Sequence, residues 1–170
     1  MLNDLDTTIG GTTSNSYATL AEAETYLGAR QVNDAWNGLP DIDKQGLLIL
    51  ATKQLDLLSF YGLATSQFQA LSWPRFGMVT KEGYIIQFDQ IPRQLKEAQA
   101  ELAFALAIGT FSLDPQTDIN TLKAVTVGDL SVTYRDAPIT IAYLPKIVTQ
   151  LLQPWLVGGS MVGGGHVVRG

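Results

Sequence analysis

The side chains best suited to chemistry are a single histidine and a few closely spaced carboxylates, and their spacing matches no catalytic set. His166 is the only histidine among 170 residues and lies in a glycine-rich stretch near the end of the sequence. A general base must be held within hydrogen-bonding distance of its substrate, and nothing around His166 predicts a rigid position. Because no Ser-His-acid set can be assembled, we expect a protein without enzymatic activity and without a cofactor.

The acidic side chains predict helix termini and solvated helix faces, and no metal site. The Asp-x-Asp-x-Gln-Gly run that begins at Asp41 resembles the start of a calcium-binding loop, which needs an acidic ligand at its twelfth position. Thr52 occupies that position, so we expect Asp41 or Asp43 to cap a helix instead. Glu97 and Glu101 lie one turn apart on a predicted helix, a spacing typical of a solvated face.

The composition indicates a folded chain that is poor in charge and carries no basic patch. Charged residues make up 16% of the sequence, against about 25% in an ordinary soluble domain. The net charge is −5, and the 11 Lys and Arg residues are scattered. Tight binding to nucleic acid depends on clustered cations and is therefore not expected. The low charge favours an oligomer, and no apolar run is long enough to predict a membrane span.

Hydrophobic spacing and proline positions predict a mainly α fold: a bundle of about four helices with an inserted β-hairpin and flexible arms at both ends. Thr19 and Glu22 match a capping box. The predicted helices begin at Thr19, Asp41, Pro92 and Pro145, and Pro154 ends or kinks the last one. Residues 84–88 predict a short strand, and residues 124–135 predict the hairpin. The resulting divisions are an N-terminal arm (1–18), a helical domain (19–157) and a C-terminal arm (158–170).

The Ala70–Gly77 segment, which contains Trp-Pro-Arg, predicts a rigid connector between two helices. Pro74 has no backbone donor and keeps Trp73 out of the helical region. Trp73 is a candidate both for core packing and for a subunit contact, because Trp and Arg are enriched at interfaces. Our interpretation is that Trp73 fixes the connector to the core and that Arg75 faces a neighbouring subunit. Replacing Arg75 by Ala is then expected to spare the monomer and weaken assembly.

The C-terminal arm is a second candidate for partner contact. Its apolar and basic residues Val162, Val167, Val168 and Arg169 follow a glycine-rich run. Alternating apolar side chains suit a strand that adds to the edge of a partner's sheet. The same composition is also compatible with plain disorder.

Three motifs occur in order along the chain: Asn-Ser-Tyr-Ala-Thr-Leu-Ala-Glu-Ala from Asn15, Leu-Ser-Trp-Pro-Arg from Leu71, and Ile-Pro-Arg-Gln-Leu-Lys-Glu-Ala from Ile91. Together they resemble the head-tail connector proteins of tailed phages, which are also called adaptor or head-completion proteins. The resemblance extends over residues 14–157. Some members of that family are catalogued as DnaT-like single-stranded-DNA-binding proteins.

The resemblance implies a structural protein of the virion neck that forms a homo-oligomeric ring, typically of about twelve subunits. Its implied partners are the phage portal protein and a stopper or tail-completion protein. Double-stranded DNA would pass through the lumen without specific binding, and the protein would be found in the virion and, during assembly, in the host cytoplasm. Two alternatives remain open, a single-stranded-DNA-binding replication protein and a small enzyme that uses buried Asp residues.

Overall fold

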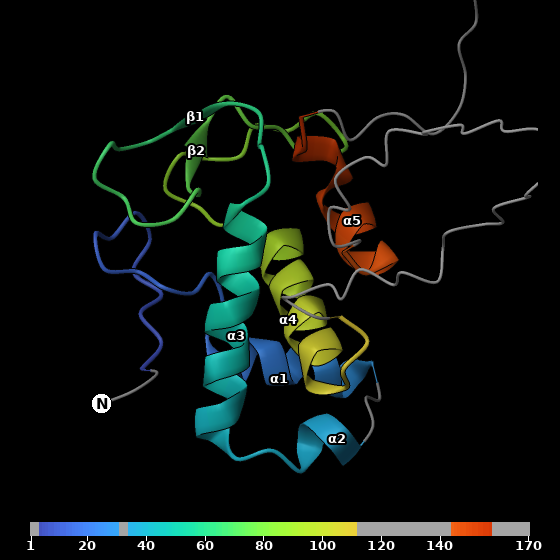
Figure 1. Cartoon of the computed structure of the whole chain (residues 1–170). Helices are drawn as coiled ribbons and strands as arrows, with labels where there is room; N and C mark the ends of the chain where they lie inside the picture. Colours follow the sequence, from blue (N-terminus) through green and yellow to red (C-terminus); the bar gives the residue numbers. More distant parts are fainter. Residues whose placement is uncertain (1–3, 31–33, 112–143, 158–170) are drawn as a thin grey trace, which may run out of the picture.

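The computed structural model describes residues 4–30, 34–111 and 144–157, and these ranges are mainly helical, as the sequence predicts (Figure 1). The helices are α1 (Leu20–Ala29), α2 (Asp34–Asn37), α3 (Asp41–Asp56), α4 (Arg93–Ala107) and α5 (Lys146–Leu152), followed by a 3₁₀ turn, η2 (Gln153–Trp155). Strands β1 (Leu63–Ala64) and β2 (Arg75–Phe76) form an antiparallel pair. The hairpin predicted near 124–135 and the C-terminal arm predicted at 158–170 lie outside the described residues.

Helix α4 is the central element of the core. It packs against α1, α3 and α5, and Figure 1 shows α3 and α4 running side by side. By helical spacing, the sequence predicts one face made of Leu95, Ala98, Leu102, Ala105 and Gly109; the first four are buried, whereas Gly109 is exposed beyond the end of α4. Ala100 and other small side chains are buried as well, so neighbouring helices can approach α4 from more than one side.

The start of α1 agrees with the start predicted from the sequence, whereas those of α3 and α4 differ from it. The capping box is confirmed, because Thr19 Oγ1 accepts from the backbone N–H of Glu22 and the Glu22 carboxylate accepts from the N–H of Thr19. The prediction that Asp41 or Asp43 caps α3 is wrong: Pro40 is the N-cap, and no side chain caps this helix. Both aspartates lie in its first turn, where the helix dipole favours negative charge. Helix α4 likewise begins one residue after Pro92, whose backbone is still extended.

The segment before α1 is not the flexible arm that the sequence predicts over residues 1–18. Its described part, residues 4–18, folds into a loop that is closed by its own polar side chains. Asn15 Oδ1 accepts from the N–H of Asp6 at 2.8 Å, and Asn15 Nδ2 donates to the carbonyl of Asp4. Hydrogen bonds from Thr8 and Thr13 to the Asp6 carboxylate lower the pKa of Asp6. A composition that suggests disorder supplies the hydrogen bonds of an ordered turn instead.

A buried glutamine on α4 holds this segment against the core. Gln99 is fully buried, and its Oε1 accepts from the N–H groups of Tyr17 (3.2 Å) and Ala18 (2.9 Å). Its Nε2 donates to Ser16 Oγ at 2.7 Å and to the carbonyl of Leu48 on α3 at 3.1 Å. One amide therefore satisfies two buried backbone donors and links three parts of the chain.

The connection between α3 and α4, residues 57–92, is mostly irregular and lies at the end of the helix pair where α3 ends and α4 begins (Figure 1). The strand predicted at 84–88 is wrong, because only an isolated bridge joins Val79 and Ile85. The physical reason is that Tyr84 and Ile85 are both exposed, whereas a half-buried strand alternates. The sequence predicts turns at Gly77 and Gly83, and both residues have a positive φ, of 76° and 89°.

The chain after α5 returns to the α3–α4 connection. The α-helix ends at Leu152 and Pro154 lies in η2, which confirms the predicted stop. The N–H of Tyr61 then donates to the carbonyl of Trp155 at 2.9 Å, and the N–H of Val157 donates to the carbonyl of Ser59 at 2.8 Å. Residues 155–157 therefore run antiparallel to residues 59–61 and fix this end of the chain beside the loops.

We predict that Gln99→Leu lowers the free energy of unfolding by about 2–4 kcal/mol, because it leaves buried N–H groups of Tyr17 and Ala18 without an acceptor. Urea denaturation measures the change. The exposed substitution Gln87→Leu is the control and is expected to change the free energy by less than about 0.5 kcal/mol. Equal stability of the two variants would contradict the role assigned to Gln99.

Candidate interaction surfaces

Trp73 is a core residue that fixes the connector. The sequence makes Trp73 a candidate for core packing and for a subunit contact, and the structure shows core packing. It is 1% exposed, and its ring meets those of Phe60 and Trp155 edge to face, with centroids 5.8 and 5.4 Å apart. The peptide bond between Trp73 and Pro74 is cis. Because the indole is enclosed by its own chain, its contribution in this structure is to packing.

Arg75 is engaged within its own chain. Its guanidinium donates to the backbone carbonyls of Phe60, Tyr61, Gly62 and Ser72 at 2.6–3.3 Å. Three of these carbonyls belong to the loop after α3 and the fourth to the connector itself, so the cation joins the connector to that loop. The expectation that loss of Arg75 spares the monomer is therefore revised, whereas its contact with a neighbouring subunit stays a prediction.

Asp56, at the end of α3, connects the same connector to the N-terminal segment. Its carboxylate accepts a hydrogen bond from the Tyr17 hydroxyl and two from the N–H of Ser72, each at 3.3 Å. Burial raises the pKa of Asp56 above its usual value, although these hydrogen bonds act in the opposite direction. Burial also raises the pKa of Tyr17, so the phenol remains the proton donor of the pair.

Large apolar side chains are exposed along the α3–α4 connection, and the sequence analysis did not identify them. We call them the loop surface; they are Leu57, Tyr61, Leu63, Phe68, Phe76, Val79, Tyr84, Ile85 and Phe88. Several are neighbours in space: Leu63 pairs with Phe76 across β1 and β2, and the rings of Phe76 and Phe88 are 5.3 Å apart. Exposed apolar groups gathered in this way mark interaction sites. The signal available in the sequence was apolar content without a helical period over residues 60–91.

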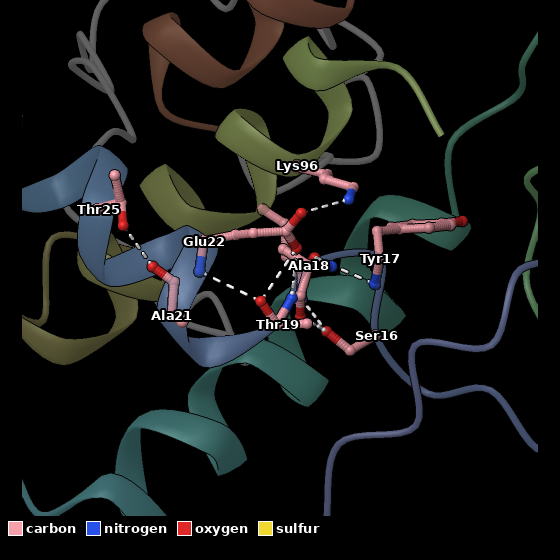
Figure 2. Close-up of polar contacts among 9 residues, drawn as sticks. Ser16, Tyr17, Ala18, Thr19, Ala21, Glu22, Thr25 and Lys96 are labelled. Atoms are coloured by element: carbon pink, nitrogen blue, oxygen red, sulfur yellow. Dashed lines mark hydrogen bonds and ion pairs between the residues drawn. The ribbon is translucent and has the colours of Figure 1, made fainter. Parts of the chain in front are cut away.

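A groove of about 470 Å³ lies between α1 and the first turns of α4. Its lining includes the small side chains Ala18, Ala21, Thr25 and Ala29 and four charged residues, Glu22, Arg93, Lys96 and Glu97. The charged residues form two ion pairs, Lys96 with Glu22 and Arg93 with Glu97, each at 2.6 Å. Figure 2 shows Lys96 pointing to the carboxylate of Glu22, which also caps α1 through Thr19. The lining of the groove thus combines small side chains with charged residues whose charges cancel in pairs.

The cations within the described ranges form no basic patch. Eight of the 11 Lys and Arg residues lie there, and four of them are in ion pairs: Arg30, Lys44, Arg93 and Lys96. Arg75 is held by carbonyls, which leaves Lys53, Lys81 and Lys146 on separate elements. Over the same ranges, no group of three His, Asp or Glu residues is placed to hold a metal ion, and no helix is long and apolar enough to cross a membrane.

The other residues predicted to contact a partner lie outside the described ranges. They are Val162, Val167, Val168 and Arg169. His166 lies there too. Of the two carboxylates predicted on a solvated face of α4, Glu97 lines the groove, whereas Glu101 is 2% exposed. The prediction is wrong for Glu101, because Arg30 and the Tyr26 hydroxyl bind this carboxylate inside the fold.

We predict that Arg75→Ala lowers the free energy of unfolding by about 1–3 kcal/mol, because four carbonyls lose a charged donor. Arg75→Lys is expected to recover only part of this loss, since one ammonium lacks the geometry of the guanidinium fork. Urea denaturation of both variants, with Lys81→Ala as an exposed control, measures the effect. An Arg75→Ala protein as stable as the control would restore the original expectation for this residue.

A pH dependence follows from Asp56. Its folded-state pKa is above the usual value of 3.8, so Asp56 stabilises the fold at low pH and loses that contribution as the pH rises through the folded-state pKa. We predict that Asp56→Asn becomes progressively more stable relative to the wild type between about pH 3 and about pH 7. Urea denaturation across this range tests the prediction, with the exposed Asp89→Asn as control. A stability difference that does not change with pH would refute it.

Comparison with known protein families gave one match, and it covers nearly the whole chain. The family model is described as "Putative DnaT-like ssDNA binding protein" and matches residues 4–170. No curated protein and no solved structure matches the chain. Because the matched range includes the capped α1, the Trp-Pro-Arg connector and α4, the chain belongs to this DnaT-like family.

Proposed function

We propose that this protein is a structural subunit that associates with copies of itself, in the manner of the phage head-tail connector proteins that its sequence resembles. The observation that carries the proposal is the loop surface, a set of exposed apolar and aromatic side chains. Protein interfaces are enriched in aromatic residues and depleted of charge at their centre. Residues 57–88 hold only Arg75, Lys81 and Glu82 as charged residues, and Arg75 is already engaged inside the chain.

The loops that carry these side chains are anchored to the core, and this also favours their use as a binding surface. Trp73 packs against Trp155, which follows α5, and Arg75 donates to the carbonyl of Tyr61. Asp56 of α3 accepts from Tyr17 of the N-terminal segment. The exposed side chains are therefore presented by an ordered backbone. A surface that is ordered before binding loses less conformational entropy on association. The ring, its binding to portal and stopper proteins, and its place in the virion neck rest on the sequence resemblance and are part of the proposal.

A second candidate function is single-stranded-DNA binding, which membership of the DnaT-like family favours. The loop surface includes aromatic rings of the kind on which bases stack. Such sites also need cations that follow the phosphate backbone. In the described ranges only Lys53, Lys81 and Lys146 have neither an ion pair nor a hydrogen bond to carbonyls, and they lie on different elements. The charge distribution therefore supports assembly more than DNA binding.

We predict that the purified protein forms a closed oligomer, seen as a ring by electron microscopy and as one high-mass species by analytical ultracentrifugation. The double substitution Tyr84→Ser with Ile85→Ser is expected to convert it to a folded monomer, because it removes two exposed apolar contacts. Lys53→Ala, on the exposed side of α3, is the matched control. A wild-type protein that stays monomeric at high concentration would overturn the proposed self-assembly.

The second candidate is tested by fluorescence anisotropy with a labelled single-stranded oligothymidylate. Assembly without DNA binding predicts weak association that does not depend on Tyr84 or Phe68. Submicromolar affinity that falls steeply with salt, and falls again in Tyr84→Ser, would instead establish DNA binding through the loop surface.

A further inference from the structure

One part of the loop surface is a small hairpin-like turn, residues 78–86. The N–H of Ile86 donates to the carbonyl of Met78 at 2.9 Å, and the N–H of Thr80 donates to the carbonyl of Tyr84 at 2.7 Å. Met78 and Ile86 are buried and anchor its base, while Tyr84 and Ile85 are 73% and 75% exposed. Two adjacent apolar side chains are thus held out to solvent by a backbone that is already ordered.

The groove between α1 and α4 is suited to receive apolar side chains such as those on the turn. Its lining includes small side chains and two complete ion pairs. An apolar group that enters it leaves no unpaired charge buried, and so avoids the largest cost of removing charge from water. Its volume of about 470 Å³ is that of a site for a few side chains.

Charge indicates that these two surfaces meet on different copies of the chain. Each copy carries a net charge of −5, so two copies repel one another except where neutral regions face each other. The charges of Lys81 and Glu82 on the turn cancel. The groove is lined by two cations and two carboxylates, whose charges also cancel. Both surfaces are neutral, and no residue belongs to both.

We propose that Tyr84 and Ile85 of one copy occupy the α1–α4 groove of the next copy. The inference rests on the proposed self-assembly and specifies its geometry. We take the contact to be heterologous: each copy gives its turn to one neighbour and receives the turn of another, and repetition closes a ring if the rotation per subunit permits. A reciprocal exchange of turns between two copies would give a twofold dimer, for which the variant with both substitutions forms cross-linked dimers and no ladder. Contact of the loop surface with itself would instead give a twofold dimer.

The absence of cysteine from the sequence allows a direct test by disulfide cross-linking. Tyr84→Cys places a thiol on the turn, and Thr25→Cys places one on the groove wall. Under mild oxidation of the otherwise wild-type chain, we expect a cross-linked dimer when the two single variants are mixed, and none from either alone. The variant with both substitutions is expected to give a ladder of higher oligomers.

The possible results separate this inference from the function on which it rests. Cross-linking of Tyr84→Cys to itself would show a twofold contact and overturn the inference while leaving self-assembly intact. Rings that form without any Tyr84–Thr25 cross-link would also overturn it. A protein that is monomeric in every sample overturns both.

Filling the groove provides an independent measurement. Ala21→Trp occupies the groove from α1 and is expected to weaken assembly by at least about tenfold in the association constant. Lys53→Trp adds the same side chain to α3, away from the groove, and is expected to assemble like the wild type. Circular dichroism and urea denaturation establish that both variants are folded. Unchanged assembly of a folded Ala21→Trp variant would contradict the proposed contact.

Discussion

The buried amide of Gln99 is the interaction on which the arrangement of the helical core depends. It joins the segment before α1 to both α3 and α4 and uses all of its donors and its acceptor oxygen in doing so. Burial of the backbone N–H groups of Tyr17 and Ala18 is favourable only because this acceptor is present. The start of α1, and with it one wall of the α1–α4 groove, is therefore positioned by a side chain that is distant in sequence.

The loops between α3 and α4 are likewise held in place by side chains that lie apart in the sequence. They contain little regular secondary structure, so side chains provide what backbone ladders provide elsewhere. Arg75 donates to carbonyls of the loop after α3 and of the connector. Asp56 accepts from the N–H of Ser72, and Trp73 packs between Phe60 and Trp155. These contacts allow an irregular segment to display apolar side chains in fixed positions.

The distribution of charge connects this architecture to function. Half of the cations of the described ranges are in ion pairs, and the exposed apolar side chains lie where charge is sparse. Membership of the DnaT-like family places the chain beside proteins described as binding single-stranded DNA. The exposed apolar side chains and the sparse charge are the basis on which we propose a subunit contact, and the oligomer and the oligonucleotide experiments test the two functions separately.

The sequence by itself determined the features that depend on local interactions: the capping box at Thr19, the inward face of α4, and the stop at Pro154. These follow from residues within a few positions of one another, which a pattern can record. Only the tertiary structure decided that Gln99 binds the N-terminal segment and that Arg75 donates its hydrogen bonds to carbonyls of its own chain. It also decided that Tyr84 and Ile85 remain exposed. Those outcomes depend on partners brought together by folding, and no spacing along the chain encodes which buried donors and acceptors will meet.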